Sequence, residues 1–381
     1  MNKFTPGKTG IYLDNAATTS LSASMKKYLL SILDLYGNPS SLHSVGKPVK
    51  QILSKSRQSA ADFINADPKD IFFTPSGSAS SALAIRGYGL KHNCTILYSP
   101  IAHKSILEYT SNIINSYPLM VDNHGFIDFD YLKKQLDDRR IKPFVIIDHA
   151  NSEIGVIQDV KKIIDLVHAY NGIVYLDCTG SIPSMPVNAK QLNADMLAFS
   201  AHKLGGLKGC GLLYKKSSVV LEPLIYGSQE GGLSAGTENV LGIASLGKAV
   251  SEYDYSSVSS ANRDYIYGCI LRNIPDCYLA GPPITSKNRL PNNLYMCFQG
   301  VEGESLAFLL DMYNIQVSTG SACNGGNQSA SAVLTAIGMN REDIPSCIRL
   351  TFSGKETKEE LDYVCDQLKE CIETLRKLNT L

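Results

Sequence analysis

The chain has 381 residues, a formal net charge of zero, 44% hydrophobic residues and 19% charged residues. This composition excludes a disordered or fibrous chain, and the balanced charge argues against nucleic acid or an anionic membrane as the main partner. The length suits two or three domains whose cores need no disulfide or metal to hold them. The first residues lack the apolar run of a signal peptide and no membrane-spanning apolar stretch occurs, so we expect a cytoplasmic protein.

The ten cysteines show no CxxC spacing and no dense framework. The sequence therefore predicts neither a metal site nor disulfides, and the thiols are expected to be free in a reducing compartment. That leaves room for one reactive cysteine.

Short apolar segments alternate with amphipathic ones between about residues 45 and 215. The predicted strands are 71–74, 95–98, 119–121, 144–147, 173–176, 196–199 and 211–214. The helical patterns between them cover 47–65, 78–90, 129–138 and 158–170. This alternation indicates an α/β fold with a mainly parallel seven-stranded sheet covered on both faces. Active groups are then expected at the carboxyl ends of the strands and at helix N-termini.

The pattern changes near residue 254 and predicts a smaller α+β domain. Its expected helices are 254–274, 303–313, 328–338 and 356–378, and strand-like segments occur at 278–283, 293–298 and 347–352. We therefore expect a large domain over 12–253, and a small domain formed by 1–11 and 254–381.

A lysine and an aspartate follow neighbouring predicted strands. Lys203 lies in Ser-Ala-His-Lys after the strand 196–199, and Asp177 ends the strand 173–176. A partly desolvated lysine can form a Schiff base with an aldehyde, and a carboxylate at a buried strand end needs a cation. Pyridoxal phosphate offers both the aldehyde and a protonated ring nitrogen. Read singly, each residue has an ordinary alternative, a surface lysine in a glycine-rich loop and a capping aspartate.

Anion-binding groups are also present. Gly77 and Ser78 open a predicted helix, where backbone N–H groups are available to a phosphate. Ser200, His202 and Thr237 are further candidates for such contacts, although Ser-Gly-Ser is also an ordinary helix cap. His103 precedes another helix, where it could cover an aromatic ring and move protons, or simply cap the helix.

Two residues toward the C-terminus suit an amino-acid substrate. Cys323 lies in a loop of small polar residues, where a thiol can approach a substrate as a nucleophile. Arg349 lies in an apolar strand-like segment, where it would clamp a substrate carboxylate or form a structural salt bridge.

Six segments of the sequence together resemble the NifS-type cysteine desulfurases, which belong to the class V group of fold-type I pyridoxal-phosphate enzymes. They are YLDNAATT at 12–19, GNPSSLH at 37–43, HANSEIG at 149–155, SAHK at 200–203, AGTEN at 235–239 and GSAC at 320–323.

The resemblance implies a homodimer that takes sulfur from L-cysteine, releases L-alanine and passes a persulfide on Cys323 to an acceptor protein, for iron–sulfur clusters or thiolation. It implies Lys203 as the Schiff-base residue, with His103 over the ring and Asp177 at the ring nitrogen. The other cofactor contacts implied are Gly77, Ser78, Asn151, Ser152, Ser200, His202 and Thr237, the last of them in the neighbouring subunit's site. Arg349, with Asn38, would hold the substrate carboxylate. No metal is implied.

Some positions depart from the family pattern. Ser152 stands where an asparagine is usual, Gly180 replaces a glutamine, and Ser234 replaces an arginine. Ser78 and Ala79 stand in place of a threonine–glutamate pair. Each lost hydrogen bond would cost about 0.5–1.5 kcal/mol, which predicts weaker cofactor binding or altered ring electronics.

These departures leave two other functions open. One is a pyridoxal-phosphate lyase or transferase acting on another amino acid, such as selenocysteine. The other is a non-catalytic scaffold for sulfur transfer. The retained lysine, aspartate, histidine, cysteine and arginine favour the desulfurase.

Overall fold

The computed structural model describes residues 10–138, 142–319 and 331–379. Its larger sheet has seven strands in the order β2-β8-β7-β6-β5-β3-β4, with β8 antiparallel to both of its neighbours and the other pairs parallel. The strands are β2 (Ile71–Thr74), β3 (Thr95–Tyr98), β4 (Ser116–Pro118), β5 (Pro143–Asp148), β6 (Ile173–Asp177), β7 (Met196–Ser200) and β8 (Gly211–Lys215). The mainly parallel seven-stranded sheet is thus confirmed.

One predicted strand is misplaced. The segment 119–121 was expected as a strand, but β4 ends at Pro118, and Val121 makes only an isolated bridge with Ile127. Leu119, directly after the strand, still donates its N–H to the Tyr98 carbonyl of β3, and its side chain is buried in the core.

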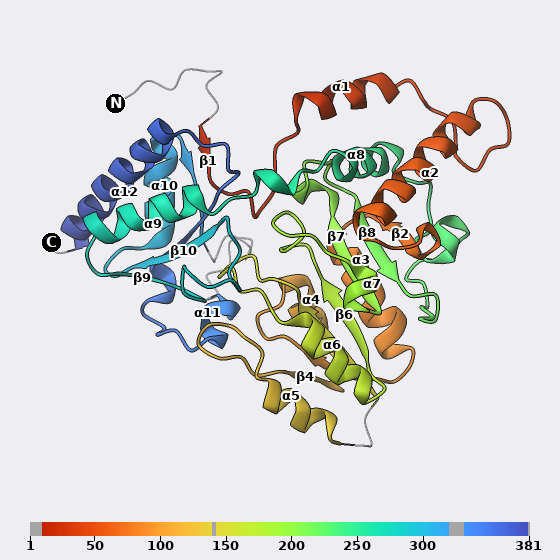
Figure 1. Cartoon of the computed structure of the whole chain (residues 1–381), viewed down its shortest axis with the longest axis horizontal. Coiled ribbons are helices and arrows are strands. Elements are labelled where there is room, and N and C mark those ends of the chain that lie inside the picture. The colour runs from red at the N-terminus through yellow and green to blue at the C-terminus, as the bar shows by residue number, and fades with distance from the viewer. Residues whose placement is uncertain (1–9, 139–141, 320–330, 380–381) are drawn as a thin grey trace.

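Helices cover both faces of this sheet (Figure 1). The helices in this part of the chain are α1 (Ala23–Ile32), α2 (Gly46–Phe63), α3 (Gly77–Ala84), α4 (Lys104–Thr110), α5 (Phe129–Leu136), α6 (Val160–Ala169), α7 (Ala189–Leu192) and α8 (Val240–Ser251). Side chains alternate between two cores, as a pleated strand requires. Phe144 and Tyr175 pack in the core with α3 and α4, whereas Val145 and Leu176 pack in the core with α2, α6 and α8.

A second, antiparallel sheet has the order β12-β13-β10-β9. Its strands are β9 (Cys277–Leu279), β10 (Asn293–Phe298), β12 (Ser318–Thr319) and β13 (Cys347–Thr351). The helices in this part are α9 (Ala261–Asn273), α10 (Gly303–Met312), α11 (Ala332–Ala336) and α12 (Lys358–Asn379). Figure 1 shows α9, α10 and α12 beside this sheet, as the predicted α+β arrangement requires.

The N-terminal part of the described chain joins this second core. β1 (Ile11–Tyr12) pairs in parallel with β11 (Ile315–Gln316), and Leu13 is fully buried among the residues of the second core. The chain then continues toward the larger sheet. The boundary expected near 253–254 stays a prediction. In the described ranges, none of the helices has both the length and the apolar character needed to cross a membrane.

Candidate active site

Three polar side chains gather at one edge of the larger sheet, at the ends of β5, β6 and β7. Asp148 and Asp177 occupy paired positions of adjacent parallel strands, and Ser200 ends the next strand. Their positions in the pleat place them on the face of the sheet that carries α3 and α4. All three are buried, with 5, 8 and 5% of their surface exposed. This is the edge at which the alternating pattern predicts active groups.

The N-terminus of α3 lies against this edge. Ser76 caps the helix by accepting the N–H of Ala79, and the N–H of Gly77 donates to the Ser200 Oγ at 3.0 Å. A Cβ on Gly77 would lie 2.7 Å from that oxygen and 3.3 Å from the Thr179 Oγ1. The glycine therefore permits a close approach of backbone and hydroxyl groups that suits an anion. Ser78 is exposed in the first turn of the same helix.

Lys203 ends the short helix η3 (Ala201–Lys203), immediately after β7. Its Nζ donates to the carbonyl oxygens of Ala16 and Ala17, the latter at 2.9 Å. The 14–19 segment is fixed to the same loop, because the Thr19 N–H and hydroxyl both donate to the His202 carbonyl. The lysine is thus held beside the sheet edge by a segment that comes from the N-terminal part of the chain.

A small cavity connects the lysine with two of the positions that depart from the family pattern. Lys203, Asn15, Ser152, Thr179 and Gly180 all line it. A Cβ on Gly180 would lie 2.5 Å from the Ala150 carbonyl oxygen and 3.4 Å from the Ser152 Cβ. A glutamine at position 180 would therefore clash with the 150–152 backbone, so its loss follows from the way this backbone packs.

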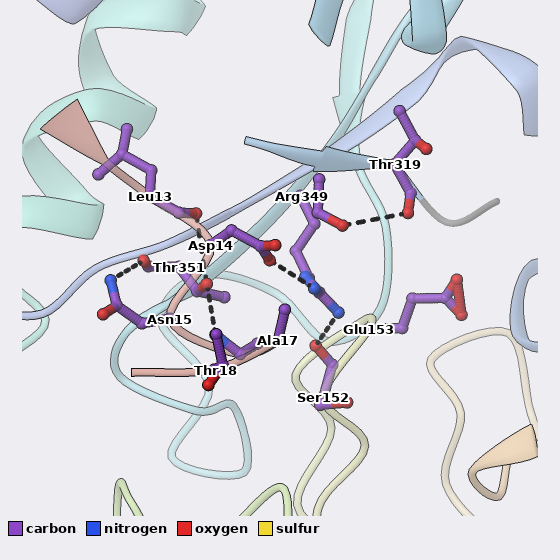
Figure 2. Close-up of polar contacts among 12 residues, drawn as sticks. Leu13, Asp14, Asn15, Ala17, Thr18, Ser152, Glu153, Thr319, Arg349 and Thr351 are labelled. Atoms are coloured by element: carbon purple, nitrogen blue, oxygen red, sulfur yellow. Dashed lines mark hydrogen bonds and ion pairs between the residues drawn. The ribbon is translucent and has the colours of Figure 1, made fainter. Parts of the chain in front are cut away.

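Arg349, on β13, forms the salt bridge that was one of its two predicted roles. Its Nη2 lies 2.8 Å from the Asp14 Oδ1, and its Nη1 donates to the Ser152 carbonyl at 3.3 Å. Figure 2 shows the guanidinium pointing between these two groups, with Glu153 close by. The Nε is buried and makes no hydrogen bond within the described part of the chain. The structure therefore shows the salt bridge, and the contact of Arg349 with a substrate carboxylate stays a prediction.

Glu153 connects this region to α11. Its carboxylate accepts the hydroxyl hydrogen of Ser331 at 2.8 Å, and burial raises its pKa to about 7 although Ser331 and Arg349 act in the opposite direction. Ser331 is the N-cap of α11, so Glu153 fixes the start of that helix next to the arginine.

His103 and Asn151 are both near the sheet edge. His103 is the exposed N-cap of α4, and its Nδ1 contacts the backbone N–H and the hydroxyl of Ser105. The Asn151 side chain donates to the Ile101 carbonyl and accepts the N–H groups of Glu153 and Ile154. These bonds give Asn151 a role in shaping the 151–155 turn, and its predicted contact with the cofactor stays a prediction.

Two of the remaining predicted residues make other contacts, and a third is exposed. His202 bonds through Nδ1 to the Thr18 hydroxyl, and burial and Lys203 lower its pKa to about 4, so it is neutral at pH 7. Asn38 is exposed, and its side chain accepts the N–H of Ser40 rather than contacting Arg349. Thr237 is exposed as well. Cys323, the predicted nucleophile, lies outside the described residues.

The site contains residues that sequence reasoning did not single out. Asp14 forms the salt bridge with Arg349, Glu153 accepts the hydroxyl hydrogen of Ser331, the N-cap of α11, and Asp148 lies next to Asp177. Asp14 and Glu153 both lie inside segments that resemble the NifS-type enzymes, 12–19 and 149–155, and this position was the available signal. Asp148 could have been found as a carboxylate that ends an apolar strand, the same signal that identified Asp177.

The family model described as Aminotransferase class-V matches residues 11–364, which is most of the chain. The chain belongs to the class-V aminotransferase family. It is 37% identical to "Cysteine desulfurase IscS" of Dictyoglomus turgidum, in an alignment covering 98% of this chain and 97% of that protein. A protein of the same name from Methanosarcina thermophila is 35% identical, with 97 and 94% covered.

Solved structures agree with this family. A structure titled "NIFS-LIKE PROTEIN" superposes with a TM-score of 0.87 at 28% identity, covering 96% of this chain and 100% of that one. "SspA in complex with cysteine" gives a TM-score of 0.78 at 26% identity, covering 91 and 100%. The fold-type I architecture expected from the sequence is therefore confirmed.

The family uses pyridoxal 5'-phosphate, and the residues present fit this cofactor. The N-terminus of α3 with Ser200 suits the phosphate, Asp177 suits the ring nitrogen, and Lys203 is close enough to share a cavity with Thr179 and Gly180. The closeness of Gly77 to Ser200 and Thr179 supports this fit, since a side chain at position 77 would crowd the hydroxyl groups that face the start of α3.

Proposed function

We propose that this chain is a pyridoxal-phosphate-dependent cysteine desulfurase, which converts L-cysteine to L-alanine and retains the sulfur as a persulfide on Cys323. The observation that carries the proposal is the convergence of Lys203, Asp177 and the α3 N-terminus at one sheet edge. Arg349 donates a hydrogen bond to Ser152, which lines the same cavity as Lys203. Nearly full-length similarity to cysteine desulfurases supports it.

When bound, the cofactor would withdraw electrons from the substrate amino acid through its protonated ring. Asp177 would keep the ring nitrogen protonated, since an ionised carboxylate favours a neighbouring cation. Arg349 would orient the substrate carboxylate, and the Nζ of Lys203 would move a proton at the substrate Cα. The exposed ring of His103 would cover the cofactor and carry a second proton.

Cys323 would complete the reaction. Its thiolate would attack the substrate sulfur, so that an S–S bond forms as the C–S bond breaks, and the carbon left behind takes up a proton to give alanine. Cysteine plus a thiol gives alanine plus a persulfide, so atoms and electrons balance without an external oxidant.

The test uses the cofactor-loaded protein and L-cysteine, with alanine and protein-bound persulfide as the readouts. Borohydride reduction followed by peptide mapping should place the pyridoxyl group on Lys203. Cys323→Ala should abolish alanine formation while keeping the cofactor, and Cys277→Ala, at a partly exposed cysteine in β9, is the matched control. Full activity in Cys323→Ala, or a pyridoxyl group at another residue, would contradict the proposal.

We also propose that the working enzyme is a homodimer. Several large apolar side chains around α1 and in the segment after β8 are exposed, which is typical of an interface. They are Leu30 (68%), Tyr36 (85%), Leu42 (85%), Ile225 (65%) and Tyr226 (75%). The exposed Thr237 supports the same idea, since a residue that serves the neighbouring site would be exposed in a single chain.

Sedimentation should therefore give the mass of two chains. The double variant Tyr36→Asp, Leu42→Asp should sediment as one chain, whereas Phe308→Asp on the exposed side of α10 should stay dimeric. A wild-type protein that sediments as a single chain would refute the dimer.

The persulfide would pass to a thiol of an acceptor protein, for iron–sulfur clusters or thiolated products, in the cytoplasm. The family resemblance supports this part of the proposal. Loading the enzyme with labelled cysteine and following the label to a candidate acceptor would test it, and Cys323→Ala is the negative control.

A further inference from the structure

Asp148 is a buried carboxyl group that the reaction proposed above does not use. Only 5% of its surface is exposed, and neither carboxyl oxygen makes a hydrogen bond of normal geometry among the residues that the structure describes, although the backbone N–H of His103 interacts with the group. An unpartnered buried carboxylate is costly, because it loses its hydration without compensation. A group kept in such a position calls for a functional explanation.

The geometry places this carboxyl at the proposed cofactor site. Asp148 pairs in register with Asp177 across the parallel strands β5 and β6, so both side chains are on the face that carries α3 and α4. The backbone N–H of His103, at the start of α4, interacts with Asp148 from the same side. The unpartnered group thus lies between the residue assigned to the ring nitrogen and the residue assigned to the ring face.

Electrostatics decide which of the two carboxyl groups keeps its charge. Burial, and then the neighbouring Asp177, raise the pKa of Asp148 well above its ordinary value, and the His103 amide offsets this only in part. The other titratable groups that interact with Asp148 are Tyr175 and Cys178, whose pKa values are raised by burial, so neither supplies a positive charge. Burial therefore favours the neutral form of Asp148, which carries an O–H donor.

Asp177 has room for that donor. Its Oδ1 accepts the N–H of Thr179 at 2.8 Å, and a carboxylate has about four acceptor positions. We propose that Asp148 is a positioning residue of the cofactor site, a protonated carboxylic acid whose O–H bonds to the Asp177 carboxylate and orients it toward the ring nitrogen. The proposal rests on the proposed function, because it takes Asp177 as the partner of the ring.

This pairing has a chemical consequence. A hydrogen bond from a neutral acid draws negative charge away from Asp177, as in other sites where one of two adjacent carboxyls keeps its proton. The electron-withdrawing strength of the ring would then depend on two carboxyls rather than one. Asn at position 148 keeps a donor of the same shape but cannot ionise, which makes Asp148→Asn the informative variant.

Infrared difference spectroscopy in D2O at pH 7.5 tests the proposal through the C=O stretch of an undissociated carboxylic acid. The difference spectrum of wild type minus Asp148→Asn should show this band, with the intensity of about one carboxylic acid per chain, both with and without cofactor. Adding pyridoxal phosphate should shift the band in wild type, because the new partner changes the charge on Asp177. The difference spectrum of wild type minus Glu153→Gln identifies any contribution to the band from Glu153, another buried acid whose pKa is raised.

Absence of the band, or a band that cofactor binding leaves unchanged, would overturn the proposal. The wild-type difference between the cofactor-bound and cofactor-free proteins needs no variant, so a variant that fails to fold does not block the test. Failure of the proposed function would look different, since the protein would show no visible absorption and no labelling of Lys203.

Discussion

Replacing His149 by Asn should change how the stability of the protein depends on pH. His149 follows β5, is 4% exposed, and contacts the Ser181 Oγ through Nδ1 at 3.1 Å. Burial lowers its pKa from 6.5 to about 4, so the imidazole is neutral in the folded protein at pH 7. Its backbone also joins the strand ends, because its N–H donates to the Asp177 carbonyl at 2.8 Å.

The sign and the size of the change in unfolding free energy with pH follow from this pKa. Between pH 6.5 and about 4 the unfolded chain binds a proton at His149 that the folded chain does not, so the histidine destabilises the protein as the pH falls. Above pH 6.5 it is neutral in both states and has no such effect. The pKa difference corresponds to about 3 kcal/mol of unfolding free energy, fully lost near pH 4.

Urea unfolding followed by circular dichroism measures this effect, since the chain has no tryptophan to serve as a fluorescent probe. At pH 7.5 His149→Asn should be less stable than wild type by about 1 kcal/mol, for the altered contact with Ser181. At pH 4.5 the order should reverse, because only wild type loses stability to protonation of His149. His43→Asn, at an exposed histidine before α2, is the control for substitution alone. A constant difference between wild type and His149→Asn at both pH values would refute the reasoning.

Two further changes test the site directly. Gly77→Ala places a Cβ 2.7 Å from the Ser200 Oγ, so the affinity for the cofactor should fall about tenfold or more. The unfolding midpoint of the cofactor-free protein should change little. Equilibrium dialysis against pyridoxal phosphate measures the affinity, and an unchanged affinity would contradict the assignment of this helix start to the phosphate. Asp14→Asn removes the carboxylate that neutralises Arg349, whose side chain is 7% exposed, and should cost about 3 kcal/mol in urea unfolding. The double variant Asp14→Asn, Arg349→Met should recover most of that loss, and equal stability of the single and double variants would argue against a buried pair.

The parts of the fold that the sequence predicts are those with a clear period. The strands β2, β3, β5, β6, β7 and β8 are short apolar runs bounded by polar residues, and they occur where expected. The sequence pattern did not indicate α8, because most of its residues are buried and no polar face marks the helical period. β4 is displaced because an exposed edge strand of three residues carries little hydrophobic signal.

In the candidate site, too, some residues could be placed from the sequence and others could not. Asp177, Ser200 and Lys203 follow predicted strands directly, so their meeting at one edge could be expected from the parallel order of the sheet. Asp14 could not be assigned a partner, because its salt bridge to Arg349 joins residues far apart in the sequence and depends on how β1 and β13 are placed. Such pairings depend on tertiary packing, which local patterns do not contain.

The 13–19 segment physically links the substrate-binding and cofactor-binding sides of the site. Leu13 is buried in the core of the smaller sheet, and Asp14 holds Arg349 on β13. Two and three residues further on, Ala16 and Ala17 accept hydrogen bonds from Lys203, which lies on the larger sheet. Figure 2 shows how closely this segment passes Arg349 and Ser152. Because so few residues separate these contacts, the segment couples the position of Arg349 to that of Lys203.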